Sequence, residues 1–183
     1  MLEVPTGQFF WGVVVGLLLS FVGGWTLARV TISMTQAHQK RTVVLFCADT
    51  VQNIRNIVLD LDRVRDRARI IHHDFMALIE IEVQIYGRNR EHLIHLPDDV
   101  RGDVREFMNG IAIKRAEVMN RLEQFGQSWR VSDQLSADGQ KEASEREREK
   151  ATAVLQEAHK AVDRLATLAN GSSRLLEKLT SLK

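Results

Sequence analysis

Residues 44–61, VLFCADTVQNIRNIVLDL, place apolar side chains at alternating steps of three and four. Because an α-helix has about 3.6 residues per turn, this spacing lines them up along one helix face. β-branched residues at the a positions and Ile or Leu at most d positions are typical of a coiled-coil or bundle seam. Within a helix predicted over 36–86, we expect a seam made of Val44, Val51, Ile54, Val58 and Leu61.

Beyond residue 61 the same register continues with less apolar residues. Arg65 and His72 occupy a positions and Glu82 a d position, while further apolar residues lie beside the seam. A broadened apolar face favours a multi-helix bundle over a two-stranded coiled coil. His72 is interpreted as a core histidine or register device. A pH switch is the alternative, because histidine titrates near neutrality.

The rest of the chain also favours helices. Its 183 residues include only two prolines, Pro5 and Pro97, and scarce proline suits long helices. We predict a helix over 98–124 beginning at Pro97, a loop over 126–139, a helix over 138–169 with Asp138 as its N-cap, and a short helix over 173–182. The expected fold is all-α: one N-terminal transmembrane helix followed, over 31–183, by an antiparallel bundle of long helices or a coiled-coil domain.

The transmembrane prediction rests on residues 9–28, FFWGVVVGLLLSFVGGWTLA, which contain no charged side chain. A helix needs about 20 apolar residues to cross the hydrocarbon core of a bilayer, and aromatic rings favour its interfaces. We therefore predict a transmembrane helix over 9–30 after a short tail, 1–8. A cleaved signal peptide fits less well, because the tail has Glu3 and no Lys or Arg and the apolar segment is long.

Positive residues flank this segment on its C-terminal side. Arg29, Lys40 and Arg41 follow it, whereas no Lys or Arg precedes it. By the positive-inside rule, the N-terminus lies outside and the helical domain is cytoplasmic, in a single-pass protein of the inner (plasma) membrane. The opposite topology would suit a protein that spans the cell envelope.

A small residue recurs at every fourth position of the apolar segment: Gly12, Gly16, Ser20, Gly24 and Ala28. Residues four apart share one helix face, and small side chains let two membrane helices approach closely. The stripe predicts membrane packing, either in a homo-oligomer or in a complex with other membrane proteins.

Composition and motifs do not favour an enzyme. The formal net charge is +1, which argues against nucleic acid as the main partner. No phosphate-binding loop, nucleophile elbow or zinc-protease motif occurs, so we expect no cofactor and no small-molecule substrate. Cys47 occupies a seam position and is interpreted as a buried thiol. His92 and His95 are weak metal candidates, since the Glu-x-x-His pattern of bundle metal sites is missing.

The sequence thus favours a membrane-anchored helical scaffold or accessory subunit that self-associates or docks other membrane proteins. The alternative is a membrane-linked sensor or signal-relay module with a His-based pH or metal switch. The partner, the stoichiometry and the process served stay open at this point.

Overall fold

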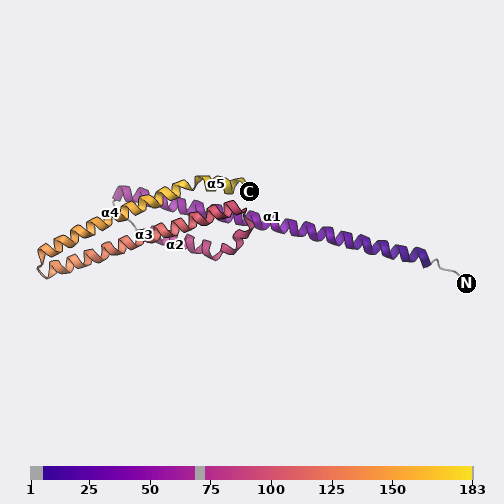
Figure 1. Ribbon diagram of the computed structural model, residues 1–183, viewed down its shortest axis with the longest axis horizontal. Coiled ribbons are helices and arrows are strands. Elements are labelled where there is room, and N and C mark those ends of the chain that lie inside the picture. The colour runs from indigo at the N-terminus through magenta and orange to yellow at the C-terminus, as the bar shows by residue number, and fades with distance from the viewer. Residues whose placement is uncertain (1–5, 69–72, 183) are drawn as a thin grey trace. The chain divides into compact units, whose positions relative to one another are not determined.

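The computed structural model describes the backbone of residues 6–68 and 73–182, and the side chains of residues 25–65 and 73–182. Within these ranges every regular element is a helix, which confirms the all-α class. In chain order (Figure 1) the elements are α1 (Thr6–Ala68), α2 (His73–Arg88), the 3₁₀ helix η1 (Arg90–His95), α3 (Asp98–Ala137), α4 (Lys141–Gly171) and α5 (Ser173–Ser181).

The chain forms two compact units, Met1–Thr42 and Val43–Lys183, and α1 contributes to both. In the first unit the side chains of residues 25–39 are all exposed. They include five large apolar ones: Trp25, Leu27, Val30, Ile32 and Met34. The hydroxyl of Thr31 donates to the carbonyl of Leu27 and that of Thr35 to the carbonyl of Thr31, both at 2.9 Å. These hydroxyls are therefore satisfied within the helix itself.

Across the side chains that the structure describes, no helix is both long enough and apolar enough to cross a membrane. Residues 9–24 of the predicted span lie outside those side chains. The transmembrane helix therefore has no support from the structure and stays a prediction from the sequence.

The seam lies in the core of the second unit. Val44, Val51, Ile54, Val58 and Leu61 are each 0% exposed, and Cys47 is 1% exposed. They belong to one cluster with buried residues of α2, α3, α4 and α5. The apolar stripe is thus consumed by the chain's own bundle. The sequence had also allowed a coiled coil with a second copy, but in the structure the stripe is already buried and cannot form one.

The predicted single helix over 36–86 differs from the structure, which has α1 and α2 in its place. The amide of Asn53 donates to a carboxylate oxygen of Glu82 at 3.2 Å. In one straight helix these residues would lie about 40 Å apart. The chain therefore reverses between α1 and α2, which lets both helices bury apolar faces in the same core.

The longest pairing in the unit is between α3 and α4, which form an antiparallel hairpin (Figure 1). At the open end of the hairpin α5 follows directly after α4 and packs on α3, where Lys178 pairs with Asp103 at 2.5 Å. Near that end Leu168 of α4 fills the space in front of Gly110, because a Cβ there would lie 2.9 Å from Leu168 Cδ2. The absence of a side chain at Gly110 therefore lets Leu168 of α4 pack closely against α3.

The predicted loop over 126–139 is wrong for most of its length, because α3 continues to Ala137. Ser132 and Ser144 are buried where the two helices meet. Each hydroxyl donates to the other residue's carbonyl, at 3.1 Å from Ser132 and 3.0 Å from Ser144. Short side chains allow this close approach, so residues that favour turns in isolation are held in a helix by packing.

The turn between α3 and α4 is correspondingly short. Asp138, predicted to cap the start of the third long helix, instead follows the end of α3, and its N–H donates to the carbonyl of Gln134. Gly139 has φ +77°, a left-handed conformation that suits glycine. The chain then enters α4 at Lys141. The helix start predicted at Pro97 is confirmed, with Asp98 and Asp99 in the first turn of α3.

Candidate functional site

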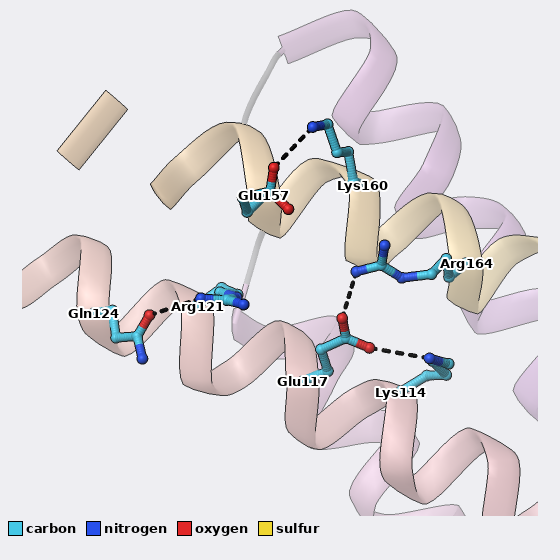
Figure 2. A network of polar contacts seen from close by, with 7 residues as sticks. All are labelled: Lys114, Glu117, Arg121, Gln124, Glu157, Lys160 and Arg164. Carbon is cyan, nitrogen blue, oxygen red and sulfur yellow. Dashed lines mark hydrogen bonds and ion pairs between the residues drawn. The ribbon is translucent and has the colours of Figure 1, made fainter. Parts of the chain in front are cut away.

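A polar network connects the outer faces of α3 and α4 (Figure 2). The carboxylate of Glu117 lies between the ammonium group of Lys114, at 3.1 Å, and the guanidinium of Arg164 on the opposite helix. On the same surface Lys160 donates to Glu157 at 2.8 Å and Arg121 to Gln124 at 3.2 Å.

The electrostatics of this network favour ionised carboxylates. The hydrogen bond from Lys114, helped by Arg164, lowers the pKa of Glu117, and the hydrogen bond from Lys160 lowers the pKa of Glu157. Both acids are therefore poor general acids near neutral pH. The network consists of polar surface pairs, of which the Glu117–Arg164 pair joins α3 to α4 and the others lie within one helix.

A second polar contact joins α1 to α4. The guanidinium of Arg65, 12% exposed, pairs with Asp62 at 2.7 Å and with Asp163, and it donates to the carbonyl of His159 at 3.1 Å. Desolvation lowers the pKa of His159, and the positive charge of Arg65 acts in the same direction. Arg65 was expected as a polar seam position, and the structure shows it as an ion-pair hub at the edge of the core.

Arg115 holds α2 against α3. Its Nε donates to the carbonyl of Met76 at 2.8 Å, and Nη1 lies 2.7 Å from a carboxylate oxygen of Glu80. The side chain is 20% exposed, so this charged contact is partly shielded from water. The sequence pattern missed this role, because no local spacing links residue 115 to a helix nearly forty positions earlier.

α2 is apolar on two sides. Met76, Ile79 and Tyr86 face the core, at 0%, 0% and 6% exposure. Leu78, Ile81 and Ile85 remain exposed at 47%, 51% and 38%. These three residues, spaced by three and four, form one stripe on the helix, which we call the outer stripe of α2. A helix that is apolar on opposite sides is normally covered on both.

The end of α3 presents an exposed aromatic group. Trp129 is 43% exposed, and its ring centroid lies 5.8 Å from that of Phe125. The guanidinium of Arg148 from α4 lies 5.9 Å from the Trp129 ring. The tryptophan falls in the segment that the sequence assigned to a loop, and it packs along the side of the hairpin.

The predicted membrane-packing stripe is for the most part outside the described side chains. Gly12, Gly16, Ser20 and Gly24 lie there, and Ala28 is exposed. The structure therefore does not test their packing. At the C-terminal end of the predicted span, the structure describes the guanidinium of Arg29, which lies 4.1 Å from the centroid of the Trp25 ring.

The two histidine candidates lie three residues apart in one short helix. His92 and His95 lie in η1, where His92 is exposed and 3.8 Å from the carboxylate of Glu91. Among the described residues, no group of three or more His, Cys, Asp or Glu side chains is placed to hold a metal ion. His72, the proposed pH switch, lies outside the described residues.

Cys47 is buried, as its seam position predicted, and burial raises its pKa to about 12. Burial also raises the pKa of Tyr86, with Cys47 as a further contributor. At neutral pH the thiol is therefore protonated, and a protonated thiol is a weak nucleophile.

Comparisons of the chain with known protein families, with curated proteins and with solved structures found no match. The function is therefore argued from the residues and their geometry alone.

Proposed function

We propose that this protein is a single-pass, membrane-anchored helical scaffold whose bundle docks other proteins. The observation that carries the proposal is the uncharged segment 9–28, whose C-terminal end carries Trp25 paired with Arg29. Tryptophan favours the membrane interface, and an arginine near the end of a membrane helix extends its charged group toward the headgroups. Their 4.1 Å contact suits the level at which an anchor leaves the bilayer.

In this proposal the bundle is the folded domain that binds partner proteins. Its buried seam gives a stable core, and its helices are fixed to each other by the charged contacts of Arg65 and Arg115. The outer stripe of α2 and the ring of Trp129 leave apolar surface exposed. Exposed apolar surface on a well-packed domain marks interaction sites. For the sensor alternative, the described residues hold no group of three or more His, Cys, Asp or Glu side chains placed around a metal ion, and His72 lies outside those residues.

Membrane anchoring is tested by extracting membranes that contain the full chain with alkaline carbonate. We expect the native protein to stay with the lipid, and the double variant Val14→Arg, Leu18→Arg to be released, because a charged side chain at mid-bilayer is costly. Ile113→Arg, on an exposed position of α3, is the matched control and should stay bound. Release of the native chain by carbonate would overturn the anchor.

Topology is tested with an impermeant maleimide and the variant Lys183→Cys. Cys47 will not interfere, because it is 1% exposed and its pKa is raised to about 12. We expect labelling only after the cells are opened. Labelling of intact spheroplasts would place the bundle on the outer side and refute the cytoplasmic assignment.

A further inference from the structure

The geometry of α2 points to a specific partner: we propose that its outer stripe docks against the same stripe of a second copy of this chain, antiparallel, with Ile81 at the two-fold axis. This inference rests on the proposed scaffold function, because it names the partner for one surface of that scaffold. All the residues involved belong to the second unit.

The first argument is the apolar character of α2. One side is fixed in the core by Met76 and Ile79, both fully buried. The opposite side carries the outer stripe, about half exposed, at positions where a solvent-facing helix normally has charges. Covering this stripe would remove three large aliphatic side chains from water, and such burial is the main driving force for association.

The second argument is charge complementarity. Asp74 lies seven residues before Ile81 and Arg88 seven residues after it, and both are exposed. Two copies of α2 paired antiparallel about Ile81 place Asp74 of each copy near Arg88 of the other. A parallel pair would place like charges together. Because the charges are equidistant from Ile81, the surface is self-complementary, as a two-fold interface requires.

The same residues argue against a lipid surface as the occupant. Helices that lie on membranes carry several Lys or Arg residues beside their apolar face. Beside the outer stripe, the exposed residues of α2 are His73, Asp74, Ala77, Gln84, Gly87 and Arg88, so Arg88 is the one Lys or Arg among them and Asp74 offsets its charge. This charge pattern fits a matching helix better than anionic headgroups.

The decisive experiment is disulfide crosslinking of the full chain in lipid nanodiscs. In Ile81→Cys the two engineered thiols meet at the axis, so mild oxidation should give a covalent dimer. Val131→Cys, at an exposed position of α3, is the matched control and should stay largely uncrosslinked, as should the native chain, whose Cys47 is buried. No dimer from Ile81→Cys, or equal dimer from both variants, would overturn the proposal.

A charge-swap series tests the orientation. Asp74→Arg places arginines opposite each other and should raise the dissociation constant about tenfold, while Asp74→Arg with Arg88→Asp should restore it. If only the helix dipole mattered, the double variant would be weaker than the single one, because it places a positive charge at the start of α2 and a negative charge at its end. A double variant weaker than the single one would therefore refute the antiparallel pairing. Unchanged circular dichroism must show that each variant is folded.

The anchor can also hold copies together, so the crosslinking is repeated with Gly16→Leu and Ser20→Leu. These changes obstruct the small-residue stripe. We expect Ile81→Cys still to crosslink, at a yield at least half that of the intact anchor. Loss of crosslinking only in this background would show that the anchor alone forms the dimer, and would overturn the α2 interface while leaving the scaffold proposal intact.

Discussion

Gly126 offers a sharp test of the unexpected length of α3. The sequence predicted a loop beginning at this residue, whereas the structure places it inside α3. A Cβ built on Gly126 meets no atom within 4 Å. Alanine therefore fits without strain, and it lowers the conformational entropy that the unfolded chain loses on folding.

We expect Gly126→Ala to raise the free energy of unfolding by about 0.4–1 kcal/mol. For a unit of this size, that corresponds to an increase in melting temperature of about 1–3 °C. The measurement is thermal unfolding of the full chain in mild detergent, followed by far-ultraviolet circular dichroism.

Three other glycines provide matched controls. Gly102→Ala, also in α3 with no atom near its Cβ, should stabilise by a similar amount. Gly110→Ala should gain less, because its Cβ lies 2.9 Å from Leu168 Cδ2 and that side chain must move. Gly139→Ala should destabilise by about 1–2 kcal/mol, since its φ of +77° disfavours a Cβ. If Gly102→Ala stabilises and Gly126→Ala does not, the helix does not extend through residue 126.

Four further substitutions probe the core and its contacts. Ile54→Ala, at a fully buried seam position, should lower the free energy of unfolding by about 2–4 kcal/mol in a denaturant titration. Ile113→Ala, at a position 65% exposed, is the control and should change it by less than about 0.5 kcal/mol. Equal effects of the two variants would contradict the burial of the seam. Arg115→Ala should cost about 1–2 kcal/mol and speed amide exchange in α2, because it removes a charged hydrogen bond to each of two acceptors; unchanged exchange would argue against the contact. The pKa of His159 is lowered from 6.5 in the folded state, so its contribution to stability is present above that pH and is lost as pH falls toward the folded value. Between about pH 7.5 and pH 5.5, the melting temperature of the native chain should therefore fall by more than that of the His159→Gln variant. An equal fall in both would show that His159 is not the group responsible.

Much of the bundle could be predicted from the spacing of apolar residues along the chain. The seam residues from Val44 to Leu61 were expected to share one face, and all five are fully buried. The start of α3 at Pro97 was also readable, because proline and acidic residues have definite preferences in a first turn. These features depend on neighbours within a few positions along the chain.

Other features depended on contacts between distant residues. The reversal after α1 could not be read from a stretch that lacks glycine and proline, since both apolar faces continue the same periodicity. The extension of α3 through residues 126–137 depends on Ser132 and Ser144, which stabilise each other only across the hairpin. Local propensity favours turns for such residues, and packing overrides it.

The candidate surface divides in the same way. The spacing of Leu78, Ile81 and Ile85 is visible in the sequence, but their exposure is not, because α2 is apolar on its other side as well. A periodic pattern identifies residues that share a face and does not say which face the core covers. The sequence by itself determined that the chain is helical and has an uncharged segment before the bundle. Only the tertiary structure decided that the seam is buried within one chain and that the outer stripe of α2 is left exposed, because burial depends on what residues far apart in the chain place against each face.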